Sequence, residues 1–323
     1  MIVRVLWIGL LALLPLVASP AYAQDYPNRT ITMIVPFPPG GGNDTMARIV
    51  ANKLSAALGQ TVVVDNRGGA NGVIAMRAAV KAPPDGTTVI FANSSTTSIN
   101  PALYANVGYD PRKDFAAVSM IASTSLGIIA KPDFPAKSVA DLIARAKEKP
   151  DAFDIGTSPP GSGSHLAAAL FKARAGLAVT LVPYKGAAAL TNDLLGGHIP
   201  VAFSVLPPAL GNIQSGALRV VAVTGRSRLE LLPDVPTVAE SGLPDFAAVL
   251  TYGLLAPRGT PGAIVERLNK ELRAMVATDE VRASVSREAG VTLASSPEDY
   301  ATEIAREDAL WGPLVRGLNI KVD

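Results

Sequence analysis

Short apolar runs alternate with segments of helical periodicity along most of the chain, and this alternation constrains the fold more than any other feature. The run Ile31–Val35 is followed by a glycine-rich turn and then by apolar residues at three- and four-residue spacing up to Leu58. Gly59 stands where a helix commonly ends, and the strand-like run Val62–Val64 comes next. Strands that alternate with helices indicate βαβ units, which form a mostly parallel sheet covered by helices. The sequence therefore predicts an α/β fold.

The same alternation continues to the C-terminus. Further strands are predicted at Thr87–Phe91, Leu126–Ala130, Phe153–Gly156, Val179–Val182, Ile199–Phe203 and Leu218–Val223. Polar residues that commonly precede or cap a first helical turn predict helix starts at Asn43, Ser138, Thr237, Thr260 and Ser296.

The chain has 323 residues, which is long for a single core, and its elements suit two similar α/β units, one split by the other. Two short polar segments, Ala122–Thr124 and Thr224–Arg226, are the expected crossings and could act as paired hinge strands. One domain would then consist of residues 24–123 and 226–323, and the other of residues 124–225. We expect a ligand cleft between them.

The first 23 residues have the pattern of a signal peptide. Arg4 is followed by the apolar run Val5–Ala18, and Ala21-Tyr22-Ala23 fits the small-x-small pattern that precedes a cleavage site. A retained membrane anchor is the alternative, but the apolar run is short of the roughly 20 residues that span a bilayer. The sequence predicts cleavage after Ala23 and, since the leader is of the bacterial type, a periplasmic protein.

Charge and composition exclude several functional classes. The 29 basic and 27 acidic residues leave no single-sign field that could hold nucleic acid or an anionic membrane. The chain has no cysteine and two histidines, which removes disulfides, thiolate nucleophiles and cysteine-based or histidine-rich metal sites. We expect no metal and no cofactor.

Three loops rich in glycine and hydroxyl residues follow predicted strands: residues 36–45, 93–98 and 156–165. Successive glycines before a helix let backbone N–H groups converge where the helix adds partial positive charge, and such a cradle binds phosphate or carboxylate. The first loop is neither a Walker loop nor a dinucleotide fingerprint, because it lacks Gly-Lys-Ser/Thr and has Thr45 in place of the last glycine. Plain structural turns are the alternative for all three loops. Ser204 and Thr251-Tyr252 are expected at similar strand ends.

Ser162 and His165 could together belong to an exported hydrolase. No acidic residue lies near His165 in the sequence, and no Gly-x-Ser-x-Gly elbow or plausible triad is present, so a helix-capping or ligand-lining histidine is the favoured interpretation. One helix-end contact to an anion contributes about 0.3–1 kcal/mol when exposed and up to ~2 kcal/mol when sheltered. Micromolar binding requires about 8 kcal/mol, so several cradles must converge. We therefore expect two domains that close over the ligand.

Many segments resemble the Bug family of periplasmic solute receptors, also called TctC-like, which serve tripartite tricarboxylate transporters. The resemblance covers essentially the whole chain after the leader. It rests on Ile34–Gly42 with Asp44 and Arg48, Asn66–Ala70, Ala82–Gly86, Ile99–Tyr104, Tyr109–Phe115, Val182–Gly186, Asp193–Gly197, Leu232–Glu240 and Gly253–Pro257.

This resemblance implies a two-domain periplasmic binding protein of type II (flytrap), each domain a mostly parallel sheet flanked by helices, joined by two hinge strands. It implies a monomer without enzymatic activity that captures a small organic carboxylate, holds it by backbone N–H groups, hydroxyls and waters, and delivers it to membrane permease subunits. A carboxylate-sensing receptor for a signalling partner is the alternative. The implied ligand-binding residues are Phe37, Gly40, Gly41, Asn43, Asp44, Ser94, Ser95, Thr96, Gly161, Ser162, Ser164, His165, Tyr184 and Ser204.

The chain departs from the family pattern at three positions. Asn43 stands where relatives often have threonine, and Tyr252 where they often have tryptophan. Ser204-Val205 stands where relatives often have Asp-Asn, so an aspartate that could meet a ligand amine is missing. This last difference favours plain mono- or dicarboxylates or an aromatic acid over amino acids.

Overall fold

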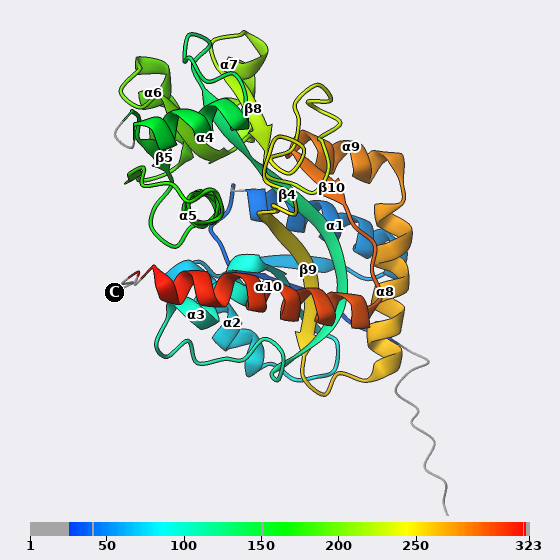
Figure 1. Cartoon of the computed structure of the whole chain (residues 1–323). Helices are drawn as coiled ribbons and strands as arrows, with labels where there is room; N and C mark the ends of the chain where they lie inside the picture. Colours follow the sequence, from blue (N-terminus) through cyan, green and yellow to red (C-terminus); the bar gives the residue numbers. More distant parts are fainter. Residues whose placement is uncertain (1–25, 41, 150–151, 319, 321–323) are drawn as a thin grey trace, which may run out of the picture.

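The computed structural model describes residues 26–40, 42–149, 152–318 and 320. The expected leader and its cleavage site after Ala23 lie outside the described residues, as does Gly41. Within the described part, strands and helices alternate as the sequence predicts (Figure 1).

The strands form one sheet in the order β2-β1-β3-β9-β4-β7-β5-β6, with β8 and β10 also paired to β4. Their bounds are β1 Ile31–Val35, β2 Val62–Asn66, β3 Thr88–Asn93, β4 Phe115–Ala130, β5 Ile155–Thr157, β6 Leu181–Pro183, β7 Val201–Val205, β8 Arg219–Val223, β9 Val249–Pro257 and β10 Gly290–Thr292. The predicted strands are confirmed within a few residues at their ends, except the one at Leu126–Ala130, which begins much earlier.

The helices have the following bounds: α1 Gly42–Leu58, α2 Val73–Val80, α3 Asn100–Leu103, α4 Val139–Glu148, α5 Gly163–Ala175, α6 Ala187–Gly196, α7 Leu210–Gln214, α8 Gly262–Val276, α9 Asp279–Arg287 and α10 Pro297–Gly317. Three short helical turns accompany them: η2 Ala70–Gly72, η3 Ser95–Ile99 and η4 Pro207–Ala209.

Strand β4 belongs to two groups of strands. Its first part, from Phe115 to Ser125, pairs antiparallel with β9, and its last part, from Leu126 to Ala130, pairs antiparallel with β7 and β8. The first group contains the parallel strands β1, β2 and β3, and the second contains the parallel strands β5, β6 and β7. Each group thus combines three parallel strands with antiparallel ones, so the sheet is mixed, and both groups share one long strand.

Each group is covered by helices on both faces. In β1, Met33 and Val35 lie in a core with α1 and α8, whereas Ile34 lies in a core with α2 and the start of α10. This period of two is what a strand buried on both faces requires. In the second group, α4 and α5 cover one face, and α6 covers the other.

Helix α10 contributes to both groups. Tyr300 and Ile304 pack in a core of the first group, whereas Trp311 and Val315 pack in a core of the second. The helix lies beside α3 and α5 (Figure 1). Gly253 in β9 allows this approach, because a Cβ there would lie 2.3 Å from the Tyr300 ring.

Several local predictions need correction. Helix α1 begins at Gly42, so Asn43 lies inside its first turn and is not its cap. Thr237 and Glu240 do form the two expected hydrogen bonds, of 2.7 and 3.0 Å, but no helix follows. The flanking backbone pairs instead with Val223, which donates to the Pro236 carbonyl and accepts from Val238 N, and turns follow. The helix starts after Ser138 and Ser296 are confirmed, each with a complete capping box, and α8 begins after Pro261.

The sequence analysis also missed the true extent of three strands. Residues 115–125 of β4 consist largely of small residues without an alternating pattern, so they gave no strand signal. Thr251 and Tyr252 lie inside β9 and Ser204 inside β7, not after the ends of strands. None of the described helices is long and apolar enough to cross a membrane.

Candidate functional site

The loop between β1 and α1 is held in place by Asp44. This carboxylate is 4% exposed and accepts hydrogen bonds from Gly40 N at 2.9 Å, Arg48 Nε at 3.0 Å and Asn66 Nδ2 at 2.9 Å. Burial alone would raise the pKa of Asp44, but the bonds from Arg48, Gly40 and Asn66 outweigh it and hold the pKa below its ordinary value. Because its oxygens are occupied within the loop, Asp44 acts as a positioning group.

Strand β2 supports the same loop. Asn66 Nδ2 also donates to the Phe37 carbonyl at 3.1 Å, and Arg67 N donates to the Val35 carbonyl at 2.8 Å. The loop is therefore held by two adjacent strands.

Asn43 is the unpartnered polar side chain of this loop. It is 7% exposed, and neither its amide nitrogen nor its amide oxygen has a hydrogen-bond partner among the described residues. A buried polar group left unpaired costs about 1–3 kcal/mol. A ligand or water that pairs with this amide would recover that cost.

Two cavities meet at the N-terminus of α1. One, of about 450 Å³, is lined by Phe37, Pro38, Pro39, Gly40, Gly42, Asn43 and Asn93. The other, of about 350 Å³, is lined by Gly40, Gly42, Asn43, Thr45, Met46, Thr124, Ser125, Val205, Pro207, Pro208, Tyr252 and Glu288. Gly40, Gly42 and Asn43 line both, so we call the two together the α1 cavity.

The α1 cavity lies at the carboxyl ends of parallel strands from both groups. The first loop follows β1, Asn93 ends β3 and Val205 ends β7. This is where open α/β sheets bind ligands. Neither cavity has a lysine or arginine in its lining.

The hydroxyl loop after β3 is directed toward a buried carboxylate that the sequence analysis missed. Ser94 Oγ donates to Glu307 Oε1 at 2.9 Å and accepts from Thr251 N at 2.8 Å. Ser98 Oγ and Thr251 Oγ1 also donate to Glu307, at 3.2 and 2.8 Å. The Ser94 hydroxyl, expected to meet a ligand, is therefore occupied within the protein.

Glu307 lies in α10 and is 2% exposed. Burial raises its pKa to about 7, with a smaller effect from Glu303, against the hydrogen bonds from Thr251 and Ser94 and the charge of Arg306. The sequence did hold a signal, because Glu307 continues the spacing of the buried residues Tyr300, Ile304 and Trp311 on one helix face.

Ser95 and Thr96 are also buried and engaged locally. Ser95 N donates to Asn93 Oδ1 at 3.1 Å, and Thr96 Oγ1 donates to the Asn93 carbonyl at 2.9 Å. These bonds shape the turn that places Asn93 in the lining of the α1 cavity.

The third glycine-rich loop caps α5. Ser162 Oγ accepts from His165 N at 3.3 Å, and Gly161 N donates to His165 Nδ1, also at 3.3 Å. Ser164 Oγ accepts from Ser158 N at 2.8 Å. Burial lowers the pKa of His165, so its ring is neutral at pH 7. The described contacts include no hydrogen bond between the Ser162 hydroxyl and the His165 ring, so the pairing needed for a hydrolase is not formed.

This third loop packs against the first group of strands and helices. A Cβ at Gly161 would lie 2.9 Å from Leu103 of α3, and a Cβ at Gly163 would lie 3.0 Å from Leu250 of β9. Gly161 also has a φ of +80°, which favours glycine. The loop residues do not line either part of the α1 cavity.

Tyr184 and Ser204 also lie outside the lining of the α1 cavity. Tyr184 is half-buried, and its burial together with its hydrogen bond to Asp193 raises the pKa of its hydroxyl. Ser204 is 2% exposed, and its hydroxyl has no partner among the described residues. Its neighbour Val205 lines the cavity instead.

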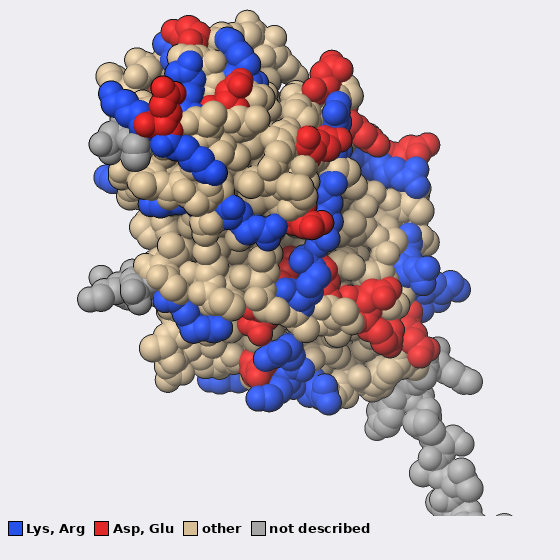
Figure 2. Space-filling view, in the orientation of Figure 1, with Lys and Arg blue, Asp and Glu red and all other residues tan. Residues whose placement is uncertain are grey.

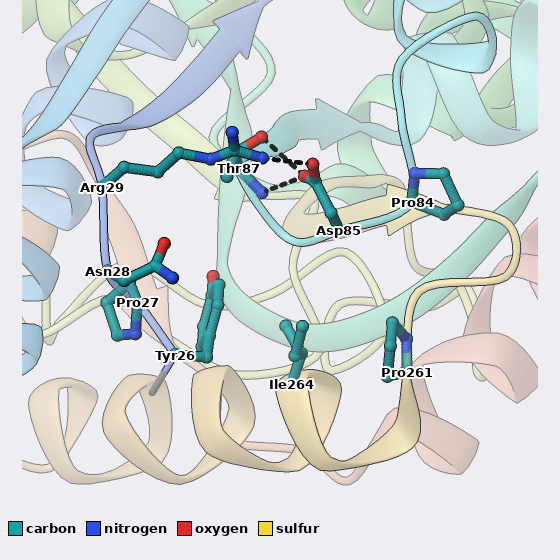
Figure 3. A pocket seen from close by; sticks show the side chains of 9 residues that line it. All are labelled: Tyr26, Pro27, Asn28, Arg29, Pro84, Asp85, Thr87, Pro261 and Ile264. Carbon is teal, nitrogen blue, oxygen red and sulfur yellow. Dashed lines mark hydrogen bonds and ion pairs between the residues drawn. The ribbon is translucent and has the colours of Figure 1, made fainter. Parts of the chain in front are cut away.

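A separate cavity of about 410 Å³ lies at the opposite ends of the strands. Its lining includes residues just before β1 and β3, and Figure 3 shows the Arg29–Asp85 pair on one side with Tyr26 and Ile264 on the other. The Arg29 guanidinium and the Asp85 carboxylate neutralise each other at 2.5 Å. Since α/β sheets bind ligands at the carboxyl ends of strands, the α1 cavity is the stronger candidate.

No group of three or more metal-ligating side chains is present in the described part of the chain. Basic and acidic side chains are interspersed over the face shown in Figure 2, as the nearly balanced composition predicts. Glu288 is acidic, and the other residues that line the α1 cavity are uncharged.

Comparisons with known proteins agree on one family. The model of the tripartite tricarboxylate transporter family receptor, TctC, matches residues 46–320. The Bordetella pertussis protein BugT is 36% identical over 307 residues, which cover 95% of this chain and 94% of BugT.

Two solved structures from Rhodopseudomonas palustris are similar over nearly their whole length. Rpa4515, solved with adipate, has a TM-score of 0.77 and 36% identity, and the match covers 91% of this chain and 99% of Rpa4515. MatC, solved with bound malate, has a TM-score of 0.73 and 28% identity, and the match covers 90% of this chain and 100% of MatC. The family model and these matches show that the chain belongs to the TctC family, the periplasmic solute-binding receptors that include the Bug proteins.

Proposed function

We propose that this protein is an extracytoplasmic receptor that binds a small organic carboxylate in the α1 cavity and delivers it to a tripartite tricarboxylate-type permease. The observation that carries the proposal is the cavity at the N-terminus of α1, with the unpartnered amide of Asn43 in its lining. The adipate and malate bound to the two related structures are both small carboxylates.

The chemistry of the lining suits a carboxylate. The N-terminus of a 17-residue helix offers unpaired N–H groups and partial positive charge, and the Asn43 amide can donate two further hydrogen bonds. The absence of lysine and arginine from the lining means that dipoles, not ion pairs, hold the anion. Of the residues named from the family resemblance, we assign direct contact with the ligand to Gly40, Asn43 and the residues next to them in the loop between β1 and α1.

Two domains closing on the ligand would shelter these contacts. We assign residues 24–123 and 226–323 to one domain and residues 124–225 to the other. In β4 the pairing changes from β9 to β7 and β8 at Ser125–Leu126, and Thr224 directly follows β8. Thr224 ties the crossings together, because its Oγ1 accepts from Leu126 N at 2.9 Å and donates to the Ala248 carbonyl at 2.6 Å. Such a pair of adjacent strands is a suitable hinge.

The remaining parts of the proposal follow from the sequence. Residues 1–23 are the leader, cleaved after Ala23, and the product is a periplasmic monomer without enzymatic activity. The local bonding of Ser162 and His165 supports the last point, since neither is poised as nucleophile or base.

Calorimetry with a panel of mono- and dicarboxylates tests ligand binding. A ligand at about 100 times its Kd should add about 2.7 kcal/mol to the free energy of unfolding. Asn43→Ala should weaken binding at least tenfold, whereas the matched control Gln214→Ala, an exposed amide on α7, should not. Failure of every carboxylate in the panel to bind would contradict the proposal.

Delivery to a permease is tested in cells. Uptake of the labelled ligand should depend on the gene for this chain at ligand concentrations near the Kd. Uptake that is unchanged by deletion of the gene would contradict a role in transport while leaving ligand binding intact.

A further inference from the structure

Glu288 is an acidic side chain inside a cavity that otherwise offers donors to an anion. It follows the last residue of α9 and lines the 350 Å³ part of the α1 cavity. Its Oε2 lies 3.8 Å from the point where a Cβ on Gly42 would stand, which places it beside the first residue of α1. A carboxylate of the protein thus lies in the 350 Å³ part of the α1 cavity, whereas the 450 Å³ part, which shares Gly40, Gly42 and Asn43 with it, has no acidic residue in its lining.

The Glu288 carboxylate has no hydrogen bond or ion pair with any described residue. Burial raises its pKa above the ordinary value, and the neighbouring charge of Arg287 opposes this effect. Arg287 itself is exposed and does not line the cavity, and the phenol of Tyr252, whose pKa Glu288 helps to raise, is neutral at pH 7. No other charged residue is in the lining, so Glu288 sets the sign of the potential there.

We propose that Glu288 is a specificity-determining residue that selects carboxylates whose other end carries an ammonium or hydroxyl group and disfavours a second carboxylate. The inference rests on the proposed binding of a carboxylate in this same cavity. A ligand ammonium or hydroxyl would donate to the unpaired Glu288 oxygens, whereas a second carboxylate would face a like charge across a partly desolvated space.

This assignment differs from the expectation drawn from Ser204. The family resemblance suggested that an acid able to meet a ligand amine is missing, because serine occupies its place in β7. The structure supplies an acid from a different element, the end of α9, on the cavity wall that includes Gly42 and Tyr252. The site therefore has an acidic group after all, at a place that the motif did not indicate.

A simpler role is that Glu288 only compensates the partial positive charge at the N-terminus of α1. In that case Glu288→Gln would lower the free energy of unfolding and leave the ranking of ligands unchanged. The two roles can therefore be distinguished by the ratio of the affinities for an amino acid and a diacid. Glu288→Gln changes this ratio if Glu288 selects ligands and leaves it unchanged if Glu288 only stabilises the loop.

The test uses three ligands of equal chain length: adipate, 6-hydroxyhexanoate and 6-aminohexanoate. The three corresponding four-carbon compounds are measured in the same way. Calorimetry gives the Kd of each for the wild-type protein, Glu288→Gln and the control Glu266→Gln, which removes an exposed charge on α8. Wild-type protein should prefer the amino or hydroxy acid to the diacid. In Glu288→Gln the affinity ratio of the amino acid to the diacid should fall at least tenfold, whereas Glu266→Gln should keep the wild-type ratio.

An affinity ratio that changes less than twofold in Glu288→Gln would overturn this inference and leave the proposed function standing, as would a wild-type preference for the diacid. Absence of binding by all six compounds to all three proteins would overturn the proposed function and this inference with it. Differential scanning calorimetry on the same samples shows that each variant is folded.

Discussion

Replacing Glu307 by glutamine should make the protein more stable at pH 8 and leave it almost unchanged at pH 5. In the folded protein the pKa of Glu307 is about 7, against an ordinary value of 4.5. The folded state therefore binds the proton more tightly than the unfolded chain. The stabilisation of the fold by the protonated Glu307 carboxyl is fully present below about pH 4.5 and is lost as the pH rises to about 7.

The magnitude follows from the two pKa values. At 1.36 kcal/mol per pKa unit, the difference between 4.5 and about 7 corresponds to about 3 kcal/mol of folding free energy lost across that range. Glutamine carries no charge to desolvate. Its Oε1 can accept from Ser94 and Thr251, and its Nε2 can donate to Ser98 Oγ, so the hydrogen bonds are kept.

The charged groups around Glu307 do not reverse this sign. Glu303 on the same helix also raises its pKa, and Arg306 lowers it by less than burial raises it. Arg306 is occupied by Glu303, with bonds of 2.6 and 2.7 Å. The Tyr300 hydroxyl is buried without a partner among the described residues and remains neutral, since burial and Glu307 both raise its pKa.

Urea denaturation of wild-type protein, Glu307→Gln and the control Glu298→Gln, an exposed acid on α10, would be measured at pH 5, 6, 7 and 8. The free energy of unfolding of Glu307→Gln relative to wild type should rise by about 2.5 kcal/mol from pH 5 to pH 8. The control should show no such trend. A difference that stays constant with pH, or that falls as pH rises, would refute the argument.

Two other substitutions test the hinge and the second group of strands. Thr224→Val leaves the buried Leu126 N–H and Ala248 carbonyl without their side-chain partner. Urea denaturation should therefore show a free energy of unfolding lower by about 2 kcal/mol. An unchanged midpoint would contradict the proposed link that Thr224 makes between these two segments. Ser204→Ala removes a buried hydroxyl that has no partner among the described residues, so the melting temperature should stay the same or rise. A free energy of unfolding that falls by more than about 1 kcal/mol would contradict this, because it would mean that the hydroxyl makes a hydrogen bond.

Local patterns in the sequence predicted the parallel strands and their helices well. β1 has the predicted bounds, Ile31–Val35, because four of its five residues are apolar and both faces are buried. The capping box at Ser138 and the helix start after Ser296 could be predicted because the residues that form each cap lie within three positions of one another. The same pattern misled at Thr237, where pairing with Val223 decides the backbone conformation.

The site was harder to predict because its bonds join residues far apart in the chain. Ser94 looked like a ligand donor from its place after a strand, but its partner Glu307 is 213 residues away. Asp44 was placed in the correct loop, yet its role in holding Gly40 depends on Asn66 in the next strand. Glu288 follows no motif, and only the fold brings it beside Gly42.

The central claim is that uncharged donors at the N-terminus of α1 hold the carboxylate of the ligand. A crystal structure of the protein with the best ligand of the panel tests this most directly. We predict a ligand carboxylate within hydrogen-bond distance of the Asn43 amide and the first backbone N–H groups of α1. A carboxylate bound instead at the cavity of Tyr26 and Arg29, or held by a lysine or arginine side chain, would contradict the account.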